Sequence, residues 1–127
     1  MKTSLRLSLA LLAVVIVGGV LNIYTTKTIS DRYVSAAEEL RTLTEMEDWS
    51  RAEEVVQAYL TSWKDTLAWL QMLINHDDGD EVSRALERIG AGIQAQERPA
   101  CLEGCAELRE AAEHIYHRDA FTWGNIL

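Results

Sequence analysis

The chain has 127 residues, of which 20 are acidic and 12 are basic, and its formal net charge is −8 at pH 7. The charge is unevenly distributed, because residues 28–127 hold all 20 acidic residues but only nine basic ones, a net charge of −11. So acidic a segment repels phosphate groups, which makes nucleic acids and anionic lipid surfaces poor candidates for its partners.

The first element expected from the sequence is a membrane-spanning helix. The stretch Leu7–Thr26 contains 20 residues without a charge. At about 1.5 Å per residue such a helix is roughly 30 Å long, which matches the hydrocarbon core of a bilayer. Basic residues flank the stretch on both sides, at Lys2, Arg6 and Lys27. We therefore expect residues 1–27 to form a membrane anchor and residues 28–127 to form an acidic helical domain.

A cleaved signal peptide is the main alternative to an anchor, because a basic start followed by an apolar run is typical of both. Val17-x-Gly19 is only a weak match to a cleavage site, and the apolar run continues beyond it. The basic residues before the run favour a cytoplasmic N-terminus. We therefore expect a single-pass protein of the cytoplasmic membrane with its acidic domain on the extracytoplasmic side.

The acidic domain has helical periodicity, and no segment alternates long enough to predict a strand. We expect helices at residues 28–47, 48–75, from the His76–Asp80 turn to about 96, and 100–120, then a tail at 121–127. Asp48 is expected to cap the second helix, and Asp78 or Asp80 the third. The prediction is an all-α fold in which one transmembrane helix is followed by a small four-helix up-down bundle. One apolar residue from each helix is expected in the core: Leu40, Trp63, Leu86 and Leu108.

The apolar stripe of the first bundle helix can be followed back into the membrane span, where small and polar residues occupy it. Such residues allow membrane helices to pack together. The candidates for this packing are Ser8, Val15, Gly19 and Asn22. The alternative is that these residue types are tolerated anywhere in a span, and the lack of a Gly-x-x-x-Gly pair favours that alternative.

No group of residues predicts a catalytic or metal site. Cys101 and Cys105 lie one turn apart on an apolar face, and without two further ligands we interpret them as small core residues. A second group shares one side of the fourth helix: Glu110, Glu113, His114 and His117. The Glu-x-x-His motif of di-iron bundles is missing from it, so we interpret it as a solvated face. We therefore expect a non-enzymatic protein without a cofactor.

Apolar residues gather at one end of the expected bundle. The second helix is apolar almost all round from Leu67 to Ile74, and in an up-down bundle this end and the tail both lie next to the membrane. The candidate residues for contact with the bilayer or a partner are Trp69, Met72, Phe121, Trp123, Ile126 and Leu127. The alternative is that the tail folds back over the helix end and completes the core.

Several features together resemble one known family. They are the N-terminal span, the acidic amphipathic helices, Trp49 and Trp63 in the long second helix, the Leu-Ile-Asn-His76-Asp turn, and Asn125-Ile126-Leu127. In these features the chain is similar to the uncharacterised bacterial family called domain of unknown function 4363. The resemblance implies a small membrane-anchored helical protein of Gram-positive, often spore-forming bacteria, often encoded near a multi-pass membrane protein. It implies no catalytic residues.

The expected function follows from the anchor and from the lack of a catalytic group. We expect an interaction or accessory subunit of a membrane complex, whose partner is another membrane protein or a second copy of the chain. The alternative is an extracytoplasmic sensor or ligand-binding helical bundle, which would need a cavity between its helices.

Overall fold

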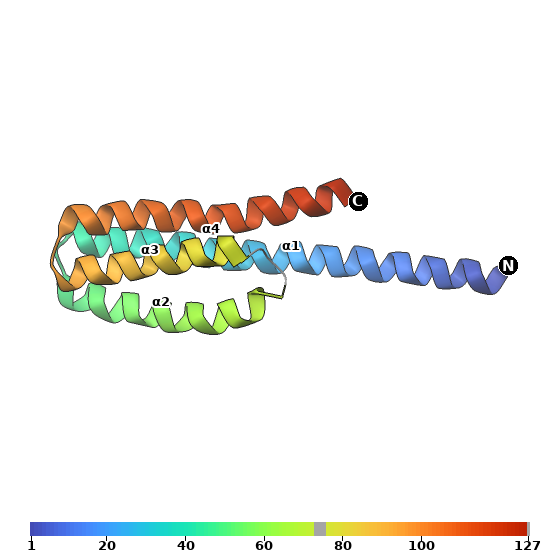
Figure 1. Ribbon diagram of the computed structural model, residues 1–127, viewed down its shortest axis with the longest axis horizontal. Helices are drawn as coiled ribbons and strands as arrows, with labels where there is room; N and C mark the ends of the chain where they lie inside the picture. The colour runs from blue at the N-terminus through green and yellow to red at the C-terminus, as the bar shows by residue number, and fades with distance from the viewer. Residues whose placement is uncertain (73–75, 127) are drawn as a thin grey trace.

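The computed structural model describes the backbone of residues 1–72 and 76–126, and all their side chains except those of residues 76, 119, 121–123 and 126. This part of the chain forms four helices and no strand, as the sequence predicts. The helices are α1 (Lys2–Glu45), α2 (Trp49–Leu70), α3 (His76–Gln94) and α4 (Arg98–Ile126). Figure 1 shows that they alternate in direction, and that the N-terminal half of α1 projects beyond the bundle.

Helix α1 is continuous over 44 residues, so the expected boundary at residues 27/28 falls inside a helix. At about 1.5 Å per residue α1 is roughly 66 Å long. Its first half exposes apolar side chains such as Leu7 and Leu21, whereas its second half buries a stripe from Tyr33 to Leu43. Among the described residues, α1 is the one helix long and apolar enough to cross a membrane.

The ends of α2 and α3 differ from those expected around the connection between them. Asp48 caps α2 as expected and accepts a hydrogen bond from the backbone N–H of Arg51. Helix α2 ends at Leu70 rather than at residue 75, and residues 73–75 lie outside the described part. The predicted turn at His76–Asp80 is wrong because α3 already begins at His76.

The prediction that Asp78 or Asp80 caps α3 is therefore also wrong. Asp77 and Asp78 lie in the first turn of the helix. Carboxylates are favourable there because they interact with the positive end of the helix dipole. The acidic residues that suggested a cap thus stabilise the helix from within its first turn.

Helix α4 is longer than expected at both ends. It begins at Arg98 rather than at residue 100. Proline is well tolerated in a first helical turn, where its missing N–H has no partner to lose. At the other end α4 continues to Ile126, so the residues expected to form a separate tail from Phe121 onward are helical up to that point.

The α1–α2 and α3–α4 turns share one geometry. Glu47 and Gln96 both adopt a positive φ of 54°, each two residues after the end of a helix. After each of them the next backbone N–H bonds back to a carbonyl in the last helical turn, from Asp48 to Leu43 and from Glu97 to Gly92. This is the Schellman arrangement, which satisfies carbonyls that a helix end leaves open.

The core contains the four side chains predicted for it: Leu40, Trp63, Leu86 and Leu108, each at most 1% exposed. Helices α3 and α4 approach each other closely at two glycines. A Cβ atom added at Gly92 would lie 2.8 Å from Cys101 Sγ, and one at Gly104 would lie 2.8 Å from Ile89 Cγ1. Glycine at these two positions therefore lets the helices pack more closely than any side chain would allow.

Candidate functional site: the membrane-proximal end of the bundle

The end of α2 lies beside the end of the apolar stretch in α1. Tyr33 Oη and Ser62 Oγ are 3.0 Å apart, which aligns α1 with α2. Because the helices are antiparallel, the eight positions from Ser62 on to Leu70 run back along α1 to about Thr25. Figure 1 shows the end of α2 and the start of α3 at the side of the bundle from which α1 projects. Helix α2 therefore returns toward the expected membrane, as the up-down prediction requires.

Two large apolar side chains are exposed at this end of α2. Trp69 is 51% exposed and Met72 is 80% exposed, whereas Leu70 between them is fully buried. The end of α2 thus has one face in the core and another in the surroundings. Leu73 and Ile74, which the sequence placed in the same apolar end, lie outside the described residues.

The other candidate contact residues belong to the end of α4 and beyond. Phe121, Trp123 and Ile126 lie in α4, but their side chains are outside the described part of the structure. Leu127 is outside it altogether. What the structure adds is the position of the helix itself, which extends past the end of α2 along α1 (Figure 1).

One buried ion pair joins the start of α3 to α4. Asp78 Oδ1 lies 2.8 Å from Arg118 Nη1, and the Asp78 side chain is 5% exposed whereas that of Arg118 is 58% exposed. Burial raises the pKa of Asp78, and the Arg118 charge acts in the opposite direction. His114 Nδ1 and Glu81 Oε2 face each other 4.0 Å apart across the same helix pair. In the described residues no three side chains form a group suited to a metal ion.

The small and polar residues of α1 divide into two sets. Ser8 and Val15 are exposed, whereas Gly19 is buried and Asn22 is half-buried. Further along the same face Thr26 is fully buried, and its hydroxyl donates to the carbonyls of Asn22 and Ile23 at 3.0 Å. The part of this face nearest the bundle is therefore covered, and the part farther from it is open.

The two cysteines lie in the core of the bundle, on the face of α4 that the sequence assigned to it. Cys101 is fully buried and Cys105 is 2% exposed, and both are free thiols. Burial is the main cause that raises both pKa values, and for Cys105 the pKa rises to about 12. Such thiols hardly ionise near neutral pH, and the thiolate is the form that binds metals and attacks electrophiles.

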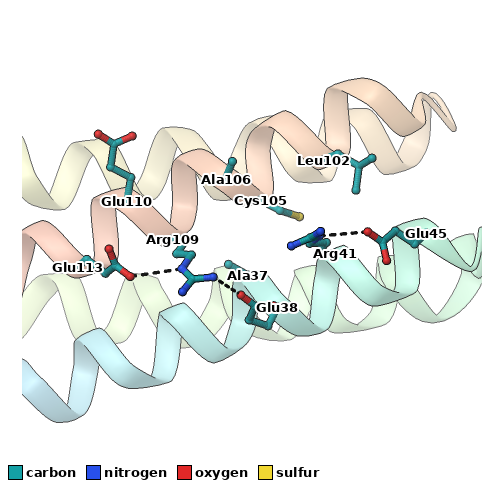
Figure 2. Close-up of a pocket in the computed structure, with 10 residues that line it drawn as sticks. All are labelled: Ala37, Glu38, Arg41, Glu45, Leu102, Cys105, Ala106, Arg109, Glu110 and Glu113. Carbon is teal, nitrogen blue, oxygen red and sulfur yellow. Dashed lines mark hydrogen bonds and ion pairs between the residues drawn. The ribbon is translucent and has the colours of Figure 1, made fainter.

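An open groove of about 460 Å³ runs between α1 and α4 (Figure 2). Figure 2 shows that its charged side chains other than Glu110 pair with one another. Arg109 bridges Glu38 of α1 and Glu113 of α4, and Arg41 pairs with Glu45 at 3.1 Å. The sequence analysis did not find the Arg109–Glu38 pair, because 71 positions separate the two residues and no local pattern connects them. The lining contains four carboxylates and two guanidinium groups, so the groove has a net negative charge and disfavours an anionic ligand.

Comparison with known proteins identifies the family. The family model described as domain of unknown function (DUF4363) matches residues 20–126, which is most of the chain. The chain belongs to this family. The DUF4363 match begins at Val20, inside the apolar stretch, and continues to Ile126 at the end of α4. The DUF4363 unit therefore includes the last part of the apolar stretch together with the whole bundle. No curated protein and no solved structure matches the chain.

Proposed function

We propose that this DUF4363 protein is a single-pass protein of the cytoplasmic membrane that acts as a non-enzymatic interaction or accessory subunit of a membrane complex. Its acidic bundle lies on the extracytoplasmic side, and its partner is another membrane protein or a second copy of itself. The observation that carries the proposal is the continuity of α1, which passes from an exposed apolar half into the core without a break.

A continuous helix supports this function because it holds the bundle in one orientation on the membrane. A flexible linker would allow the bundle to turn freely, whereas α1 presents the same end of the bundle to the membrane at all times. Trp69 and Met72 are exposed at that end. Large apolar side chains at the centre of a contact contribute most to affinity between proteins.

The geometry favours the subunit over the sensor, the alternative that the sequence left open. A sensor bundle needs a pocket between its helices, and small-molecule pockets are mostly apolar and enclosed. The groove between α1 and α4 is instead open and lined by ion pairs.

Crosslinking in the native membrane tests the proposal. A photoreactive amino acid replaces Met72, which is 80% exposed at the membrane-proximal end. The matched control replaces Gln94, an exposed residue at the last position of α3 on the opposite end of the bundle. We expect a discrete crosslinked product from position 72, identified by mass spectrometry as a membrane protein or a second copy of the chain, and none from position 94.

Two outcomes of this experiment contradict the proposal. One is the absence of a specific product at position 72 while the full chain remains in the membrane. The other concerns the anchor, which we expect to keep the protein in the membrane pellet after carbonate extraction. A mature chain that starts near Val20 and is free in the supernatant would show a cleaved signal peptide instead.

A further inference from the structure

The end of α4 reaches the level of the apolar stretch in α1. Lys27 Nζ lies 5.5 Å from the centroid of the Tyr116 ring, so these two residues are side by side on antiparallel helices. From Tyr116 to Asn125 the helix advances nine residues, or roughly 14 Å. The same distance along α1 leads from Lys27 back to Gly18, well inside the apolar stretch. Figure 1 shows α4 running in this direction past the end of α2.

In this segment, one face of α1 carries small and polar residues, whereas the rest of its surface carries large apolar residues. Gly19 and Thr26 are buried, and the side-chain oxygen Oδ1 of Asn22 is buried as well. The large apolar side chains of the same segment point outward and are exposed by between 57% and 69%: Val17, Val20, Leu21 and Tyr24. Small and polar residues inside, with large apolar residues outside, is the arrangement of helix pairs in membranes.

The sequence of α4 changes from charged to uncharged where the helix passes the end of the apolar stretch in α1. Arg118 and Asp119 are its last charged residues, and the segment 120–127 carries no charged side chain. It contains Phe121 and Trp123, and tryptophan is enriched where bilayers meet water. The uncharged part of α4 therefore begins close to the point where it passes Lys27 and enters the level of the apolar stretch.

We infer that the end of α4, residues 120–126, enters the outer half of the bilayer beside α1 and packs on the face formed by Gly19, Asn22 and Thr26. The rest of its surface is surrounded by lipid acyl chains. This inference rests on the proposed membrane anchor, because the depth of α4 is defined by its alignment with α1. The backbone N–H groups of this helix end bond to carbonyls one turn earlier, whereas the last four carbonyls of α4 have no partner within the helix, so their desolvation opposes the insertion.

We assign lipid rather than a partner protein to the outer surface of residues 120–126, because this segment lies at the same depth in the bilayer as the apolar stretch of α1. If Val20 and Leu21 face acyl chains, a helix packed next to them at the same depth faces acyl chains too. The neighbouring α3 stops at the surface, because Asp78 pairs with Arg118 just outside the uncharged segment, and Asp77 and Asp80 beside it are exposed. Charged side chains at that level keep the start of α3 out of the hydrocarbon.

Fluorescent labels at three positions measure this depth in the full chain. Cys101 and Cys105 are first replaced by Ala, with circular dichroism to verify the fold, and one new cysteine is then introduced and labelled. The test position is Asn125, which is exposed in α4, and the level-matched position on α1 is Val20. Gln94 at the far end of the bundle is the aqueous control. The chain is reconstituted into phosphatidylcholine vesicles without any other protein.

Quenching by lipids spin-labelled on their acyl chains is compared with quenching by a water-soluble ion. We expect lipid quenching at positions 125 and 20 to exceed that at position 94 several-fold, and aqueous quenching to follow the opposite order. A label at position 20 that is open to water would overturn the membrane anchor itself. If position 20 is shielded and position 125 behaves like position 94, the anchor stands and the inference about α4 is overturned.

A protein partner leaves a different signature. A label at position 125 that is open to water in pure lipid vesicles but shielded in native membranes would show that another protein covers the end of α4. A label shielded from water without lipid quenching would show coverage by a second copy. Either result overturns the lipid assignment.

Discussion

Replacing Trp63 by Ala is the most direct test of the packing described above. The Trp63 side chain is 1% exposed and lies where three helices meet. Its indole Nε1–H donates to Ser83 Oγ of α3 at 2.8 Å. Its ring packs edge-on against Tyr33 of α1, with centroids 4.9 Å apart and planes at 78°. The substitution therefore removes the largest buried side chain together with contacts to both neighbouring helices.

The magnitude follows from these contacts. Truncation of a buried aromatic residue to Ala costs about 3–5 kcal/mol, including the cavity that remains. The Tyr33 pair accounts for about 0.5–1.5 kcal/mol of this, and the hydrogen bond to Ser83 for about 1 kcal/mol. Since small domains unfold with about 5–15 kcal/mol, we expect Trp63→Ala to remove a large share of the stability. Trp63→Phe keeps an aromatic ring but loses the N–H, so its expected cost is smaller, about 1–2 kcal/mol.

Guanidinium unfolding of the full chain in detergent, followed by circular dichroism, measures these differences. Trp69→Ala is the matched control, because Trp69 lies in the same helix but is 51% exposed. We expect the control to change the free energy of unfolding by no more than about 0.5 kcal/mol. A loss below about 1 kcal/mol for Trp63→Ala, or a loss no larger than that of the control, would refute the assigned core.

Three further predictions concern α3, α4 and the buried groups between them. Gly90→Ala should stabilise the domain by about 0.5–1 kcal/mol, because only Leu60 at 3.8 Å meets the new Cβ, whereas Gly92→Ala should destabilise it by about 1–3 kcal/mol. Equal effects of the two in denaturant unfolding would contradict the close approach of α3 and α4. Burial raises the pKa of Asp78, so the folded state binds a proton more readily than the unfolded chain. The wild type should therefore gain stability relative to Asp78→Asn as the pH falls through that raised pKa toward 3.8, and a parallel pH profile of the two would show that Asp78 is solvated. Because burial raises the pKa of Cys105 to about 12, iodoacetamide should modify it at pH 8 only after unfolding, and rapid modification of the folded protein would place the thiol outside the core.

Core positions were predictable from the sequence, and helix ends were not. The apolar stripes placed Leu40 and Trp63 correctly, because a helix with one apolar face has to bury that face. The start of α3 was misplaced because the same residue types cap a helix and stabilise its first turn. The extension of α4 beyond Ala120 was missed because its uncharged segment is too short to predict a helix by itself, and it continues beside α1.

The sequence predicted which residues belong to the candidate site but not how they are arranged. The sequence identified Trp69 and Met72 as contact candidates and Gly19 and Asn22 as packing candidates. Only the structure shows which of these side chains are exposed. The order of the helices was enough to place the end of α2 near the apolar stretch of α1. It did not indicate that α4 passes this end and continues along α1.

The sequence by itself determined the long apolar stretch, the acidic domain, the all-α class and the residues that face the core. Each of these depends on composition or on a period of three to four residues, which a single helix carries whatever it packs against. Only the tertiary structure decided what lies opposite each face: Tyr33 against Trp63, Gly92 against Cys101, and the end of α4 beside the apolar stretch. Such pairs join residues far apart in the chain, and their choice depends on how all four helices share one core, which no local pattern encodes.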